Sequence, residues 1–155
     1  MEKNVFIIEQ AHFILKHNVD GPLIGIGPLI FTSHSIYFIL SGTYDQAKHI
    51  RPAGLGGLPS PSELNKEFNE IYKQSDNEKE LLRKLDKVVA EKEEKAIKIN
   101  KVEITSCKVP TSIFADTIII KTQNGRHNFT MTRTEQKKKA LDLKNYLETN
   151  LYPVK

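Results

Sequence analysis

Hydrophobic and polar residues alternate most regularly around Asn124-Gly125, in the last third of the chain. Two runs rich in β-branched residues flank this dipeptide, and an Asn-Gly pair in that setting predicts a two-residue type I′ hairpin turn. Pairing Gln123 with Arg126 then puts four large apolar side chains on one face, in the facing pairs Ile118–Met131 and Ile120–Phe129. The other face is expected to be solvated and carries Ile119, Lys121, Asn128 and Thr130.

A second apolar stretch runs from Gly21 to Leu40, and no charged residue occurs between Asp20 and Asp45. Its length would allow a membrane span. However, the polar cluster at residues 32–35 lies in its middle, and two prolines and three glycines oppose a regular helix. We therefore predict a hairpin with strands at residues 29–31 and 36–40. Both of its faces are apolar, so both need a covering layer.

The segments before and after this hairpin predict other kinds of structure. Val5–Ile8 and Ala11–Leu15 predict a bulged first strand, with one short amphipathic helix as the alternative, and Asp20-Gly21 marks a turn. Ser41–Ser60 is rich in glycine and proline and predicts a surface loop without regular structure. Its Gly54–Gly57 run lacks the ending of a phosphate-binding loop, and Gly25–Gly27 fails to complete a dinucleotide fingerprint, so both are interpreted as linkers or turns.

Two helices are predicted after this loop. Ser60 with Glu63 and Ser75 with Glu78 each have the spacing of a capping box. The apolar stripes of these helices comprise Leu64, Phe68 and Ile71 in the first, and Leu81, Leu82, Leu85, Val88 and Val89 in the second. They could cover the Gly21–Leu40 hairpin or a second copy of the chain. A possible interaction surface is therefore formed by Leu64, Phe68, Leu82 and Leu85.

Strand patterns return at Ile97 and Ile99, and the phase then slips to Val102 and Ile104, which predicts a bulge or tight corner within continuing strand. A closing helix is expected from Thr132, capped with Glu135. Its apolar stripe would consist of Ala140, Leu143, Leu147 and Leu151, and Pro153 would end the structure.

This order of elements resembles the pleckstrin-homology (PH) superfold, in particular its bacterial and GRAM-type branches. The resemblance rests on Gly27–Thr32, on the strand Ile118–Gly125, on Arg126–Phe129 and on the C-terminal helix. It implies an α+β fold: a bent, seven-stranded antiparallel barrel or sandwich plugged by Thr132–Leu151. The chain would be a single PH-like domain over residues 1–155, with a core of about 1–41 and 97–152. The helical insertion, about 60–96, departs from the family pattern.

Members of this superfold bind phosphoinositides, peptides or protein surfaces and are generally not enzymes, which makes a non-enzymatic module for a protein partner our main expectation. Specific phosphoinositide binding is disfavoured, because the first hairpin loop, residues 17–21, contains an acid and no Lys or Arg. No catalytic motif, metal-ligand set or cofactor signature is recognisable among the motifs considered, so we predict neither enzyme activity nor a cofactor.

Charge and cysteine content refine this expectation. Residues 97–155 hold 11 basic and 5 acidic side chains, whereas the rest of the chain is neutral or slightly acidic. Possible anion or partner contacts are Arg133, Lys137, Lys138 and Lys139, which would suit anionic lipid as an alternative ligand. Nucleic acid is disfavoured because no aromatic residues interleave the lysines. Cys107 alternates with Val109, which favours a buried thiol, and a single cysteine suits a cytoplasmic protein. A peripheral position at the membrane is the alternative that goes with an anionic lipid ligand.

Overall fold

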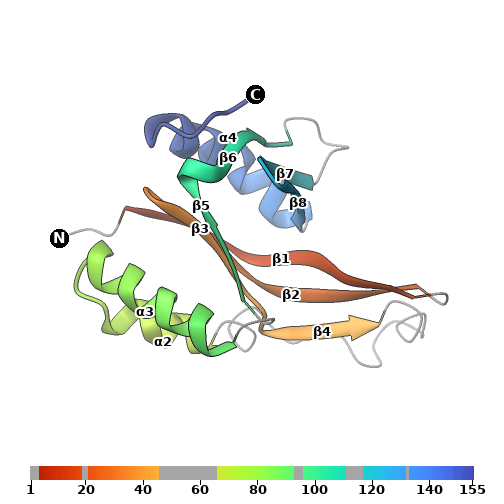
Figure 1. Cartoon of the computed structure of the whole chain (residues 1–155), viewed down its shortest axis with the longest axis horizontal. Coiled ribbons are helices and arrows are strands. Elements are labelled where there is room, and N and C mark those ends of the chain that lie inside the picture. Colours follow the sequence, from red (N-terminus) through yellow and green to blue (C-terminus); the bar gives the residue numbers. More distant parts are fainter. Residues whose placement is uncertain (1–3, 19–20, 46–65, 93–95, 111–116, 132) are drawn as a thin grey trace.

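One antiparallel β-sheet organises the chain, and helices pack on both of its faces (Figure 1). The structure is a computed structural model, and it describes residues 4–18, 21–45, 66–92, 96–110, 117–131 and 133–155. In chain order the elements are β1 (Val5–Asn18), β2 (Gly21–Thr32), β3 (Ser35–Ile39), β4 (Gly42–Asp45), α2 (Lys66–Gln74), α3 (Glu78–Lys92), β5 (Ala96–Asn100), the 3₁₀ turn η2 (Lys101–Glu103), β6 (Ile104–Lys108), β7 (Thr117–Thr122), β8 (Gly125–Met131) and α4 (Arg133–Thr149). The α+β class expected from the sequence is confirmed.

The sheet is open, and its two edge strands are joined by a short turn. Its strand order is β5-β3-β2-β1-β8-β7-β6. β4 is not part of this order and pairs with β2. The outermost strands β5 and β6 are nevertheless consecutive in the chain, joined only by η2. The tight corner expected near Val102 is therefore present, but it separates two strands instead of interrupting one, because β5 pairs with β3 and β6 pairs with β7.

The N-terminal segment is a bulged strand, as the sequence favours over the alternative helix. The pairing of β1 with β2 shifts register between Ile8 and Ala11 and again between Ile14 and Lys16. β1 also pairs with β8 through Ala11 and His12. This long strand therefore connects the two halves of the sheet.

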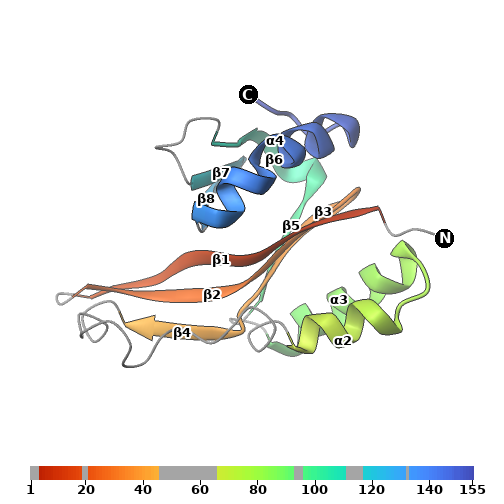
Figure 2. The same ribbon diagram turned by 180° about the vertical axis from the view of Figure 1, so that it is seen from behind.

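The β2–β3 hairpin is buried on both faces, as its apolar pattern predicts. Leu29, Phe31, Ile36 and Phe38 belong to the main core with α4 and β6–β8. Ile30, Tyr37 and Ile39 point the other way and form a second core with Phe68, Leu81, Leu85 and Val88. The helical insertion thus covers its own sheet, and Figure 2 shows α2 and α3 on the side opposite α4. None of the helices within the described ranges is long and apolar enough to cross a membrane.

The β7–β8 hairpin keeps the predicted faces but not the predicted register. Ile118, Ile120, Phe129 and Met131 are all buried. Thr122 pairs with Gly125 and Ile118 with Phe129, a two-residue difference that preserves which side chains face inward. The loop residues are Gln123 and Asn124, and neither has positive φ, so the type I′ prediction is wrong. The Thr122 hydroxyl stabilises this alternative turn: it accepts a hydrogen bond from Asn124 N at 3.2 Å and donates one to Gly125 O at 3.2 Å.

Three further local predictions are corrected. Gly42–Asp45 forms β4 and not irregular loop, and Gly25–Gly27 lies inside β2 and not in a turn. The cap of α3 is Asn77, whose Oδ1 accepts a hydrogen bond from Glu80 N at 2.9 Å. Ser75 is buried and donates its hydroxyl to Ile71 O at 2.7 Å instead. The expected caps at Ser60 and Thr132, and the Gly54–Gly57 run, lie outside the described residues.

The C-terminal end of α4 also differs from the prediction. Leu143 and Leu147 are buried, but Leu151 is exposed and adopts φ 61°. Leu151 N donates to Glu148 O at 3.1 Å and Tyr152 N to Leu147 O at 2.9 Å, which is a Schellman cap. The left-handed residue must point away from the helix stripe, so the following Tyr152 is buried in its place. Structure continues past Pro153, because Val154 bridges to Cys107 on the edge of β6.

Candidate functional site

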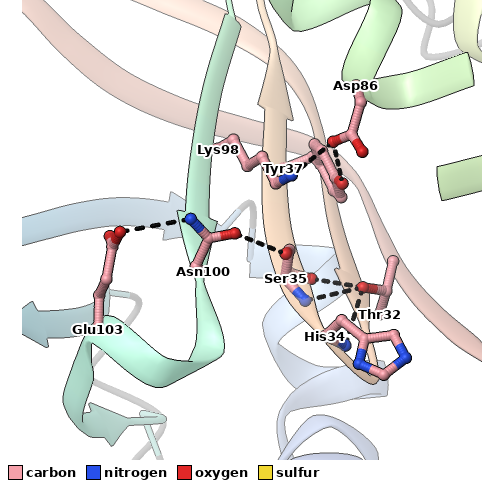
Figure 3. Close-up of polar contacts among 8 residues, drawn as sticks. All are labelled: Thr32, His34, Ser35, Tyr37, Asp86, Lys98, Asn100 and Glu103. Atoms are coloured by element: carbon pink, nitrogen blue, oxygen red, sulfur yellow. Dashed lines mark hydrogen bonds and ion pairs between the residues drawn. The ribbon is translucent and has the colours of Figure 1, made fainter. Parts of the chain in front are cut away.

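The β2–β3 turn is the centre of a network of polar contacts (Figure 3). Thr32 is fully buried, and its hydroxyl donates to Ser35 O at 2.8 Å. The same oxygen accepts hydrogen bonds from Ser35 N at 3.0 Å and His34 N at 3.3 Å. One threonine side chain therefore satisfies three backbone groups of the turn, which explains why a polar residue is found in the middle of an apolar stretch.

Helix α3 is attached to the sheet beside this turn by Asp86. Its Oδ1 accepts a hydrogen bond from the Tyr37 hydroxyl at 2.7 Å and forms an ion pair with Lys98 Nζ at 2.7 Å. Burial, together with the hydrogen bond and the negative charge of Asp86, raises the pKa of Tyr37 well above its usual range. Tyr37 therefore remains a hydrogen-bond donor at neutral pH, and the arrangement acts as a clamp and not as an acid–base pair.

Two further contacts extend the network. Ser33 donates its hydroxyl to Glu78 Oε1 at 2.6 Å, at the start of α3. Ser35 donates to Asn100 Oδ1 at 3.2 Å, and Asn100 Nδ2 donates to Glu103 Oε1 at 3.3 Å. The β2–β3 turn is thus tied to α3, to β5 and to η2.

Lys101 and Tyr152 join the closing helix to the same turn. Lys101 Nζ donates to Ser33 O at 3.2 Å and to Asn150 O at 2.9 Å. The buried Tyr152 donates its hydroxyl to Thr32 O at 2.6 Å, and its pKa is raised, chiefly by burial. Each charged or hydroxyl group in this network has a partner within the chain. No group of three His, Cys, Asp or Glu side chains in the described ranges could hold a metal ion. The network is a structural junction.

A different surface carries unmatched charge. Lys121 on β7 pairs directly with Arg126 on β8, so these two cations lie on the same face of the sheet, and both are exposed. Lys108 on β6 pairs with Ile119 and is exposed on that same face. None of the ion pairs formed between described residues involves any of the three. We call Lys108, Lys121 and Arg126 the basic face.

The predicted contact residues are distributed differently. Lys139 donates from Nζ to Ile7 O at 2.9 Å, so this cation helps attach α4 to β1. Arg133, Lys137 and Lys138 lie in the first turns of α4, but their side chains lie outside the described residues. The structure therefore does not place the four cations in one site.

The predicted apolar interaction surface is largely internal. Phe68 is 3% exposed and Leu85 is fully buried, so the expectation that these two side chains form a surface is wrong, because the chain's own sheet covers them. Leu82 is half-buried against the same cluster, and Leu64 lies outside the described residues. The basic face was missed from the sequence. Its signal, a cation on each side of a hairpin turn and on the solvated face, is present in either register.

Comparisons with protein-family models, curated proteins and solved structures found no match for this chain.

Proposed function

We propose that the chain is a non-enzymatic, PH-like binding module that recognises an acidic surface of a partner protein through its basic face. The PH-like assignment is supported by the bent antiparallel sheet and by α4, whose Leu143 and Leu147 pack into the main core beneath it. The main apolar stripes of α2 and α3 pack on the chain's own sheet, so we assign recognition to the opposite half of the molecule.

The observation that carries the proposal is the direct pairing of Lys121 with Arg126. Like charges placed opposite each other on neighbouring strands destabilise a sheet, by a few tenths to about 1 kcal/mol. Lys108 on the next strand adds a third positive charge to that face. An acidic partner would neutralise all three cations, and the repulsion present in the free protein would then contribute to binding.

The composition of this face favours a protein partner over a lipid surface. Asn128 is exposed beside the cations, Thr117 and Thr130 are half-buried there, and these groups can hydrogen bond to carboxylates. Ile119 is the one apolar side chain we place on this face, and it is only partly exposed. A polar face suits a protein surface better than the acyl region of a membrane.

Reversal of the three charges tests the proposal. Poly-L-glutamate serves as the probe for an acidic protein surface, with binding measured by calorimetry at low and moderate salt. The variant Lys108→Glu/Lys121→Glu/Arg126→Glu should bind at least about tenfold more weakly than the unchanged chain. The matched control Lys66→Glu/Lys73→Glu/Lys79→Glu makes the same change in charge at exposed lysines of α2 and α3, and it should bind nearly as well.

The alternative ligand is measured in parallel. Vesicles of phosphatidylcholine with phosphatidylserine are sedimented with each variant. If the basic face mediates pelleting with these vesicles but not poly-L-glutamate binding, anionic lipid is the ligand. Equal losses of poly-L-glutamate binding in the variant and its control would mean that only net charge matters, and this would refute the assignment to the basic face.

A further inference from the structure

Two aliphatic side chains are almost fully exposed at one corner of the molecule. Val102 is 88% exposed and Leu151 is 80% exposed, compared with 69% for Leu141 and 47% for Ile14. Val102 follows Lys101, whose Nζ is hydrogen bonded at 2.9 Å to the carbonyl oxygen of Asn150, the residue before Leu151. The two most exposed aliphatic residues of the described chain therefore each adjoin a residue of the Lys101–Asn150 contact.

The backbone of Leu151 makes this exposure more unusual. It is the one non-glycine residue with positive φ in the described part of the chain, and it occupies the cap position where glycine is strongly preferred. Tyr152 supplies the packing at this end of α4, so the leucine side chain contributes nothing evident to the fold. A strained backbone with an exposed aliphatic side chain indicates a role outside the folded monomer.

Acidic side chains flank this corner. Glu103 follows Val102 in η2, and Glu148 lies in the last turn of α4; both are exposed. The basic face begins nearby, because Gln123 N in the β7–β8 turn donates to Glu103 O at 3.3 Å, and Lys121 and Arg126 flank that turn. One end of the molecule thus carries an acidic apolar corner next to a basic face.

We propose that this end is a self-association surface and that its partner is a second copy of the chain. In a two-fold arrangement, Glu103 and Glu148 of each copy face Lys121 and Arg126 of the other. Val102 and Leu151 from both copies are then buried between them. The inference rests on the proposed function, since it uses the basic face for recognition and names the acidic protein that it recognises.

Paired charge reversal tests the arrangement. One variant has Glu103→Lys/Glu148→Lys, and the other has Lys121→Glu/Arg126→Glu. Sedimentation velocity of the unchanged chain over roughly a hundredfold range of concentration should show a monomer–dimer equilibrium. Each variant alone should dissociate, because like charges then face each other, and an equimolar mixture should form a heterodimer. A mixture that stays monomeric would overturn the proposal, as would an unchanged chain that is monomeric throughout.

The apolar contact has a test that separates association from folding. Leu151→Gly removes the side chain and relieves the strained φ, so its melting temperature should equal or exceed that of the unchanged chain at a concentration where both are monomeric. Its dimer dissociation constant should nevertheless rise at least about tenfold. Leu141→Ala is the control, since it removes an exposed leucine about 15 Å away along the helix and should leave association unchanged. A dimer that survives both Leu151→Gly and Val102→Ser would refute the proposed interface.

The experiments distinguish failure of the self-association proposal from failure of the proposed function. If the unchanged chain is monomeric while reversal at the basic face abolishes poly-L-glutamate binding, the acidic partner is another protein and only the self-association is refuted. If the dimer forms and responds to both charge reversals while poly-L-glutamate binds the variant and the helix control equally, the interface stands. In that case, binding of acidic polymers is not a property of the basic face.

Discussion

Gly27 is the position at which the smallest substitution should have the largest effect. β2 pairs with β3 through residues 29–31 and with β4 through residues 23–26, so the chain that leaves β3 crosses closely over Gly27. A Cβ atom built on Gly27 would lie 1.8 Å from Ile39 O, 2.9 Å from the Ile39 carbonyl carbon and 3.2 Å from Ser41 N. All three atoms are backbone, and no rotamer change can move them.

The cost of Gly27→Ala follows from the displacement it requires. Even a tight contact of 3.0 Å demands that the backbone after β3 move by about 1.2 Å. The bond from Ser41 N to Ile26 O, now 2.9 Å long, would not survive such a shift. Loss of the hydrogen bond to the buried Ile26 costs about 1–3 kcal/mol and overpacking a similar amount, so the free energy of unfolding should fall by about 2–6 kcal/mol.

Urea unfolding followed by far-ultraviolet circular dichroism measures this loss, because the chain lacks tryptophan. Gly125→Ala is the comparison: φ there is 151°, but no atom lies within 4 Å of the added methyl group, so only backbone strain is introduced at an exposed turn. Hydrogen exchange at Ser41 N should accelerate in Gly27→Ala alone. A Gly27→Ala protein that loses less than about 1 kcal/mol, or less than Gly125→Ala, would contradict the close approach of the two strands.

Three other substitutions or measurements test the packing described above. Leu85→Ala removes a fully buried contact between α3 and the sheet and should lower the free energy of unfolding by about 2–5 kcal/mol, whereas the exposed control Arg83→Ala should change it by less than about 0.5 kcal/mol. Asn77→Ala should lower the free energy of unfolding, measured by heat or urea, by about 1 kcal/mol, because Glu80 N loses its hydrogen bond to the cap residue. An unchanged free energy of unfolding would indicate that Ser75 caps the helix instead. Burial raises the pKa of the Cys107 thiol to about 12, so reaction with a disulfide reagent at pH 8 should be slow in the native protein and fast in urea. Because the thiol ionises at a lower pH in the unfolded protein than in the native one, the free energy of unfolding should decrease as pH rises from about 9 towards 12. Rapid labelling of the native protein would show that Cys107 is accessible.

The sequence predicted the fold best where the periodicity of apolar residues alone determines which faces must be buried. A strand pair apolar on both faces must be covered on both, and this requirement alone predicted that a second layer packs on the Gly21–Leu40 hairpin. The stripes of Phe68 and Leu85 supply that layer. The bulge in β1 was also readable, because two apolar runs were offset within one β-prone segment.

Details that depend on single hydrogen bonds were not readable. The Asn-Gly dipeptide favoured one turn, but the Thr122 hydroxyl stabilised another, and the two registers put the same side chains in the core. Ser75 does not cap α3, because its hydroxyl donates to the carbonyl oxygen of Ile71, and Asn77 is the cap instead. Apolar periodicity extended α4 to Leu151, although the left-handed backbone there turns that side chain to solvent.

The hairpin register sets how closely two cations of the proposed binding surface approach each other. With the predicted register, Lys121 would pair with Asn128, and Arg126 would lie on the same face but diagonal to Lys121. The observed register puts Arg126 directly opposite Lys121, which makes the two cations cross-strand neighbours. The insertion helices, for which the sequence left packing on the hairpin or interaction with a partner open, pack on Ile30, Tyr37 and Ile39. Burial of these helix stripes on the chain's own sheet, and not the hairpin register, therefore moves the proposed site of recognition away from the helical insertion.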